Sequence, residues 1–329
     1  MNRFNRLRQK REFIKLIRQF FTEAGFFEIE TPILVPSPGM EVFLQGFATE
    51  YANQMGERQK LYLPTSPEFA IKKALGSPDF AGQNLFEIAR VFRNSGENSP
   101  QHHPEFNMLE WYRVNADYTH IMTDCENLFC FLAATFPHTE PGYDWSPPFT
   151  RSSLAGLFKI HTGIDLNRAM ADEVYWHREA ESVLNKAPAD DDTFEDIFFR
   201  LWLDIVEPHL GREKPEIVYD YPASMAALAR RKPTDPRWSE RFEIYARGFE
   251  LGNAFSELTD PDELLARFRE NNFQRQKYGF PPHPIDHDLI EASGKMQPTG
   301  GIAVGVERLL QALTGVKDLR EFFLLPLPE

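Results

Sequence analysis

Between residues 84 and 113, alternating hydrophobic and polar residues predict two β-strands that are joined by a polar loop. Successive side chains of a strand point to opposite faces, so the first strand ends with Arg93 beside the loop. In the second strand Phe106, Met108, Glu110 and Tyr112 share one face. An acid and a phenol that point the same way form a suitable pocket for an ammonium group. The alternative interpretation is an ordinary hairpin with a half-exposed face, and for any one of these residues alone it would be the preferred one.

Helical spacing of apolar residues predicts a long first helix through residues 13–24, with Gly25 as its stop. A short strand, FFEIE, and the pair Thr31-Pro32 follow it. The other expected elements are a helix from Ser66 and Pro67 to Leu75, a helix from Asp117 to about Phe136, a helical insertion at about 150–210 packed beside the sheet, and a strand at 216–222.

Residues 241–260 predict two strands around a turn at Gly248, with Gly252 as the site of a bulge. The segment carries Glu243, Glu250 and Glu257 together with Asn253, a set suited to hard cations and ammonium groups. An acidic exposed hairpin is the alternative.

The segment 300–313 predicts a glycine-rich strand followed by an apolar-striped helix with Arg308 in its first turn. An arginine there opposes the helix dipole, so an anionic partner such as a nucleotide phosphate would explain it. The segment lacks the Gly-Lys-Ser/Thr of a P-loop.

Composition places the 329-residue chain among globular proteins, as one large domain or two small ones, with 42% hydrophobic and 26% charged residues. We find no membrane-spanning apolar run and no signal peptide, and therefore expect a cytoplasmic protein. Cys125 and Cys130 are expected to be buried free thiols. A net charge of −13 argues against a protein that wraps nucleic acid. The basic stretch at residues 3–11 is best interpreted as a solvated helix start, with an anionic partner or a transit peptide as alternatives.

Three motifs in order carry a resemblance to the class II aminoacyl-tRNA synthetases. The first helix, strand and Thr31-Pro32 resemble motif 1, the run from Phe92-Arg93-Asn94 through HHPEFNMLEWY resembles motif 2, and GGIAVGVERLLQAL resembles motif 3. ELGNAFSEL is similar to the lysine-specific branch, and the resemblance extends from Lys10 to Leu319. It implies an α+β fold: a class II catalytic core with an antiparallel β-sheet flanked by helices, as one domain over 1–329.

The resemblance also implies roles for individual residues. Arg93 and Arg308 would be catalytic, and Glu243 and Glu250 would bind Mg²⁺. The residues expected to bind ATP are Arg93, Asn94, Glu97, His102, Phe106, Glu243, Glu250 and Arg308. The residues expected to bind the amino acid are Ser66, Glu68, Glu110, Tyr112, Asn253, Glu257 and Ala303. The family often has Asn-Glu after the motif 2 arginine, whereas Ser95 stands here, so Glu97 is the candidate replacement for a contact to adenine.

Motif 1 begins within the first fifteen residues, so we expect no anticodon-binding domain. The chain thus resembles the truncated lysyl-tRNA synthetase paralogues that act as elongation factor P β-lysine ligases. That resemblance implies ATP- and Mg²⁺-dependent activation of (R)-β-lysine or lysine as the adenylate, and transfer to a lysine side chain of elongation factor P. It also implies that the protein forms a homodimer and that neither tRNA nor a membrane is among its partners. The alternatives are a free-standing lysyl-tRNA synthetase-like enzyme and a non-catalytic regulatory paralogue that binds an amino acid or adenylate.

Overall fold

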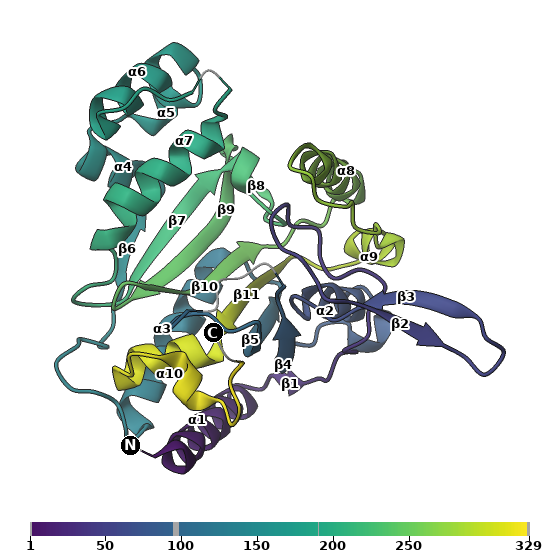
Figure 1. Cartoon of the computed structure of the whole chain (residues 1–329). Coiled ribbons are helices and arrows are strands. Elements are labelled where there is room, and N and C mark those ends of the chain that lie inside the picture. The colour runs from purple at the N-terminus through teal and green to yellow at the C-terminus, as the bar shows by residue number, and fades with distance from the viewer. Residues whose placement is uncertain (1, 95–98, 190, 328–329) are drawn as a thin grey trace.

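The computed structural model describes residues 2–94, 99–189 and 191–327. Within these residues, nine strands form one sheet in the order β1-β4-β5-β11-β10-β9-β7-β6, with β8 paired to β9 (Figure 1). Their bounds are β1 Phe27–Glu28, β4 Leu85–Phe92, β5 Glu105–Val114, β6 Thr150–Ser153, β7 Glu216–Pro222, β8 Arg231–Lys232, β9 Asp235–Ala246, β10 Phe249–Ser256 and β11 Thr299–Gly305. The central pairs are antiparallel, which confirms the predicted α+β class. The edge pairs β1/β4 and β6/β7 are parallel, which the sequence did not predict.

One face of the sheet is apolar and is covered by three helices, which Figure 1 shows together at the bottom of the molecule. They are α1 Arg3–Glu23, α3 Tyr118–Thr135 and α10 Val306–Thr314. Phe86, Trp111 and Ile302 come from adjacent strands, lie in register and are fully or almost fully buried in this core. Helix α1 ends as predicted before Gly25, and Asp117 caps α3. Cys125 and Cys130 on α3 are free thiols, as expected, but only Cys125 is fully buried, and Cys130 is half-buried.

The opposite face of the sheet carries a row of paired positions that are polar except for Ala303. Glu87 pairs with Glu110, Glu110 with Ala303, Ala303 with Asn253, and Asn253 with Glu243. Directly paired residues project to the same face, so this register gathers side chains from five strands. The predicted bulge is present, because the pairing of β10 with β9 shifts between Glu250 and Gly252. The shift lets Glu250 and Asn253 face the same side despite their odd separation.

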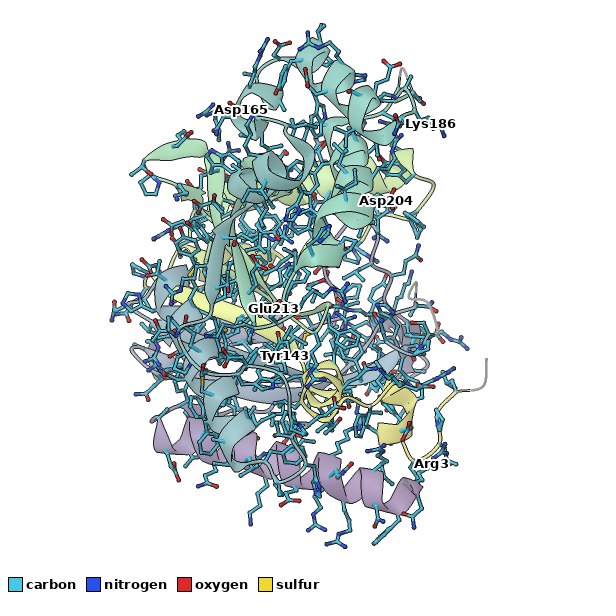
Figure 2. The ribbon with its side chains drawn as sticks, turned by 90° about the vertical axis from the view of Figure 1, so that its left-hand side faces the viewer. Arg3, Tyr143, Asp165, Lys186, Asp204 and Glu213 are labelled. Carbon is cyan, nitrogen blue, oxygen red and sulfur yellow. The ribbon has the colours of Figure 1, made fainter. Side chains whose placement is uncertain are left out.

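The predicted helical insertion consists mainly of helices, which stand above the sheet at the end opposite α1 in Figure 2. The elements are α4 Leu154–Thr162, α5 Leu166–Ala169, α6 Glu173–Leu184, α7 Phe194–Leu201, the π-helix η2 Trp202–Val206 and the 3-10 helix η3 Glu207–His209. Their apolar side chains form a second core with Val218, Tyr221 and Tyr245 of the sheet. The prediction was wrong for residues 150–153, which form strand β6 beside β7. The polar sequence TRSS shows no apolar alternation there, so only sheet pairing reveals the strand.

The hairpin β2 Ala48–Ala52 and β3 Arg58–Tyr62 lies on the right-hand side of Figure 1, together with helices α2 Glu68–Leu75, α8 Pro261–Lys277 and α9 His287–Ser293. The short 3-10 helices are η1 Pro78–Phe80, η4 Ala223–Met225 and η5 Leu319–Phe322, and η5 packs against α1 and α10. Helix α2 begins at Glu68, whose N–H donates to Ser66 Oγ over 3.0 Å. In the described part of the chain, none of the helices has both the length and the apolar character needed to cross a bilayer.

Candidate active site

A cavity of about 100 Å³ lies over the polar row of the sheet. Its walls come from the loop before α2, from α2, and from β5, β10 and β11. The lining residues are Glu41, Ser66, Glu68, Arg93, Met108, Glu110, Tyr112, Asn253, Phe255, Glu257, Gly301, Ile302 and Ala303. All seven residues predicted to bind the amino acid, together with Arg93, are therefore brought to one place from segments far apart in the sequence.

Glu110 lies at the base of this cavity and is 1% exposed. Ser66 Oγ donates to its Oε1 over 2.5 Å, and the Tyr112 hydroxyl donates to its Oε2 over 2.8 Å. Burial and the neighbouring Glu68 raise the pKa of Glu110 to about 8. A positively charged group in the cavity would stabilise the ionised carboxylate and oppose this shift.

Glu257 faces the same cavity from the end of β10. Its Oε2 lies 2.5 Å from Lys72 Nζ, whereas its buried Oε1 has no hydrogen-bond partner within the described residues. Burial raises the pKa of Glu257 to about 7, although Lys72 acts against the shift. A Cβ at Gly301 would lie 2.4 Å from Oε1, so the glycine keeps this oxygen open to the cavity. A buried carboxylate oxygen without a donor is suited to an ammonium ligand.

The phosphate-binding candidates are Arg93, which lines the cavity, and Arg308, whose positive charge acts on Arg93. The Nε of Arg93 is buried and unpaired among the described residues, and its guanidinium lies 5.4 Å from the Phe106 ring centroid. Burial lowers the pKa of Arg93, and the positive charge of Arg308 adds to the effect. Arg308 Nη1 donates to the backbone oxygen of Glu250 over 2.8 Å. Two neighbouring cations of this kind favour an anion such as a phosphate between them.

The predicted metal ligands lie on β9 and β10. Glu243 Oε2 accepts from the hydroxyls of Tyr221 (2.7 Å) and Tyr245 (2.6 Å), and Oε1 accepts from Arg241 Nη2 (2.7 Å). Burial and Glu243 raise the pKa of Glu250 to about 7, and Arg308 acts against the rise. These hydrogen bonds leave the Glu250 carboxylate and one lone pair of Glu243 Oε1 available to a cation. Among the described residues no cluster of three or more His, Cys, Asp or Glu could hold a metal. The donor set therefore fits an Mg²⁺ that arrives with ATP, since protein Mg²⁺ sites often combine one or two carboxylates with substrate phosphates.

Three site residues were missed in the sequence because only folding brings them to the site. Arg241 donates to both Asn253 Oδ1 (3.1 Å) and Glu243, and so links the two ends of the site. Glu41 lines the cavity from a loop that shows no periodic pattern. Lys72 lies on α2 and forms ion pairs with Glu68 and Glu257. The four-residue spacing of Glu68 and Lys72 was the available signal for that pair.

Other predicted ATP-binding residues lie outside the cavity. Asn94 is exposed beside Arg93, and its N–H donates to the Gln45 carbonyl over 2.8 Å. His102 lies beyond the motif 2 loop, with its Nδ1 2.8 Å from Ser99 Oγ. Glu97 and Ser95 fall outside the described residues. The roles given to these residues stay predictions.

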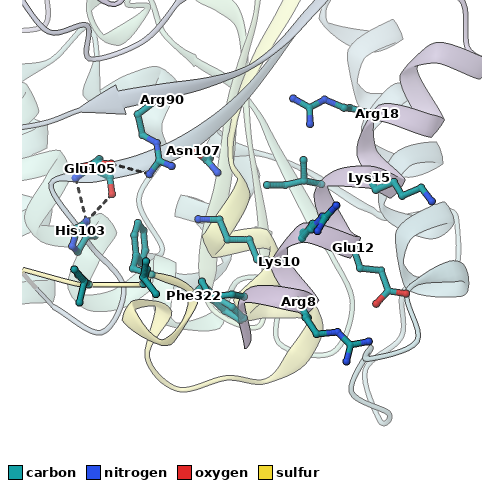
Figure 3. A pocket seen from close by; sticks show the side chains of 16 residues that line it. Arg8, Lys10, Glu12, Lys15, Arg18, Arg90, His103, Glu105, Asn107 and Phe322 are labelled. Atoms are coloured by element: carbon teal, nitrogen blue, oxygen red, sulfur yellow. Dashed lines mark hydrogen bonds and ion pairs between the residues drawn. The ribbon is translucent and has the colours of Figure 1, made fainter. Parts of the chain in front are cut away.

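A larger cavity of about 1070 Å³ lies on the other face of the sheet, between α1 and the segment 322–325 (Figure 3). Arg8, Lys15, Arg18 and Arg90 surround it. It contains none of the residues predicted to bind ATP or the amino acid. Size alone therefore does not identify the active site, and the convergence of buried carboxylates and guanidinium groups is the stronger criterion.

Comparison with known proteins agrees with the motifs and the sheet. A family model described as tRNA synthetases class II (D, K and N) matches residues 2–328. The chain belongs to this family. A relative from Mannheimia succiniciproducens, named elongation factor P–(R)-β-lysine ligase, is 38% identical over 94% of this chain and 90% of its own length. Relatives with the same name come from Vibrio vulnificus, at 35% identity over 98% and 95%, and from Haemophilus influenzae, at 36% over 92% and 89%.

Proposed function

We propose that this class II protein is an ATP-dependent ligase that activates (R)-β-lysine, or lysine, and transfers it to a lysine side chain of elongation factor P. The main support for this proposal is the cavity in which Glu68, Glu110 and Glu257 lie beside Arg93. Such a site suits a ligand with two ammonium groups and a carboxylate. The names of the relatives supply the acceptor and the preferred amino acid.

In the first step, an oxygen of the amino-acid carboxylate forms a bond to the α-phosphorus of ATP, and the bond to the β-phosphate oxygen breaks. The products are an aminoacyl-adenylate and pyrophosphate. Arg93 and Arg308 would hold the phosphates and offset the charge that develops on them, which is the largest contribution expected in phosphoryl chemistry of this kind. Mg²⁺ on Glu243 and Glu250 would neutralise phosphate charge when bound.

The acidic cavity would position the amino acid for this attack. Glu110 and Glu257 would pair with its ammonium groups, and Tyr112 and Ser66 would keep Glu110 in place through their hydrogen bonds. An amino acid that lacks the second ammonium would leave a buried carboxylate unpaired, which disfavours it.

In the second step, the amine of a lysine on the acceptor protein forms a bond to the carbonyl carbon of the adenylate. The bond between the carbonyl carbon and the phosphate oxygen breaks, AMP leaves, and the amine loses one proton.

We further propose that the protein forms a homodimer through its first helix and strand, that it is cytoplasmic, and that its reaction does not require tRNA.

Intact-mass spectrometry of elongation factor P from a host that lacks the modification tests this proposal. After incubation with the protein, ATP, Mg²⁺ and either α- or (R)-β-lysine, the acceptor should gain one lysyl unit, with more product from the preferred isomer. Incubation without ATP is the control. Charging of tRNA without any gain on elongation factor P would overturn the proposal in favour of a free-standing synthetase. The absence of both products and of amino-acid-dependent pyrophosphate release would favour a binding paralogue.

A further inference from the structure

Lys72 is a buried lysine directly behind the acidic cavity. Its side chain is 4% exposed, and its Nζ lies 2.6 Å from Glu68 Oε1 and 2.5 Å from Glu257 Oε2. Lys72 does not line the cavity, whereas both of its partners do. It can therefore act on a ligand only through the two carboxylates that it contacts.

The charges around the cavity show what this lysine changes. Ionised Glu68, Glu110 and Glu257 carry three negative charges, and Lys72 reduces the net charge of the group to minus two. Glu41 and Arg93 also line the cavity, and their opposite charges attract and offset each other. A diamino acid brings two ammonium groups, so the group is matched to its ligand only while Lys72 is present. Without Lys72, one buried negative charge would have no partner, and a carboxyl would take up a proton instead.

The position of Lys72 between two separate elements also shows how it can orient the two carboxylates. Glu68 lies at the start of α2, Lys72 lies one turn later, and Glu257 follows β10, so the ammonium of Lys72 holds together two elements far apart in sequence. With Oε2 facing Lys72, Oε1 of Glu257 is left toward Gly301 and the cavity. That oxygen has no donor within the described residues.

We propose that Lys72 is a positioning residue that sets specificity for diamino acids, because it orients Glu68 and Glu257 and limits the cavity to two uncompensated negative charges. The inference rests on the proposed function in that the ligand is a diamino acid. It adds that the protein provides an internal ammonium group as part of its recognition of the ligand.

Calorimetric binding of α-lysine and (R)-β-lysine without ATP is the primary test, on the wild type and on Lys72→Met, Lys72→Arg and Lys73→Met. We expect Lys72→Met to weaken binding of the preferred isomer at least 100-fold and Lys72→Arg to restore part of it. We also expect the Lys72→Met binding profile to move to higher pH, because the carboxylates lose the cation that favours their ionised form. Lys73 is the matched control, since it is the next residue and pairs with Asp286 instead of the cavity acids. Lys73→Met should bind like the wild type.

The double variant Lys72→Met/Glu68→Gln separates charge matching from simple support of the fold. It restores the net charge of minus two, so its affinity should equal or exceed that of Lys72→Met. A further multiplicative loss would overturn the inference, as would a folded Lys72→Met variant with wild-type affinity and pH profile. If Lys72→Met does not fold, Lys72→Arg and the double variant decide in the same way. Wild-type protein that binds neither isomer overturns the inference. Lysine-dependent exchange of pyrophosphate into ATP reports the proposed function separately, because binding can depend on Lys72 even if no exchange occurs.

Discussion

Arg308 donates from the first turn of α10 to the backbone oxygen of Glu250, 2.8 Å away on β10. The contact fixes a guanidinium group beside a carboxylate that is a candidate Mg²⁺ ligand. Because the acceptor is a backbone oxygen, the Glu250 side chain is left for a cation. The hydrogen bond of Arg308 thus leaves the carboxylate oxygens of Glu250 free of this contact, although the positive charge of Arg308 still favours the ionised form of Glu250.

Arg308→Ala should lower lysine-dependent exchange of pyrophosphate into ATP by about 10²–10³-fold, the usual effect of losing one preorganised donor to a developing charge. Binding of lysine without ATP should stay within about twofold of wild type, because Arg308 does not line the amino-acid cavity. Arg237→Ala is the control, since Arg237 lies in an exposed ion pair with Asp235. Unchanged exchange in Arg308→Ala would refute the catalytic role of Arg308.

Lysine affinity should increase as pH rises from about 6 to about 8. The pKa of Glu110 is raised to about 8 and that of Glu257 to about 7, so both carboxyls are largely protonated at pH 6 in the free protein. An ammonium ligand needs the ionised forms, and binding near pH 7 should therefore release protons. Calorimetry in buffers with different heats of ionisation measures that release directly. An affinity independent of pH over this range would contradict the assignment.

The same groups predict how stability depends on pH. A carboxyl whose folded-state pKa is raised contributes stability below its unfolded pKa and loses that contribution as pH rises through the folded value. The stability of the ligand-free protein should therefore decrease as pH rises from about 5 to about 8, because Glu110 and Glu257 lose their protons over this range. Lysine should raise the melting temperature more at pH 8 than at pH 6. Thermal denaturation with and without lysine at both pH values measures this effect in the wild type and in Glu110→Gln. The difference between the lysine-induced shifts at pH 8 and pH 6 should be smaller in the variant.

Gly301→Ala should close the amino-acid cavity. The added Cβ would lie 2.4 Å from Glu257 Oε1 and 2.5 Å from a ring carbon of Tyr112. We expect the KM for lysine to rise at least 100-fold and the KM for ATP to change little, with a loss of stability of about 1–3 kcal/mol. Gly305→Ala on the same strand is the matched control, because its nearest Cβ contact is an ordinary 3.5 Å. Equal effects of the two variants on the KM for lysine would argue against the cavity as the amino-acid site.

Glu250→Gln should raise the Mg²⁺ concentration needed for half-maximal pyrophosphate exchange by about tenfold or more, because a neutral amide binds hard cations less well than a carboxylate. Lysine binding measured without ATP and Mg²⁺ should be unaffected, since Glu250 does not line the cavity. A magnesium titration of exchange in both proteins gives the comparison. Identical titration curves would remove Glu250 from the metal site.

Much of this arrangement was predictable because it depends on local patterns. The motif 2 hairpin, the bulge at Gly252 and the position of Arg308 on its helix all follow from alternation, helical spacing and glycine placement. What the pattern lacked was cross-strand register and packing. The short strand β6 has no alternation of its own, and the approach of Lys72 to Glu257 depends on how α2 meets β10.

The row of paired positions from Glu87 to Glu243 also limits how the site can change. Neighbouring strands of a sheet lie about 4.8 Å apart, and their hydrogen bonds hold that spacing. The distance from Glu110 on β5 to Glu243 on β9 is therefore set by the backbones of β11 and β10 between them. Loop exchange would leave this distance unchanged. A shorter or longer amino acid would have to be accommodated by the side chains at positions such as 301 and 303, which makes those two positions the natural targets for redesign.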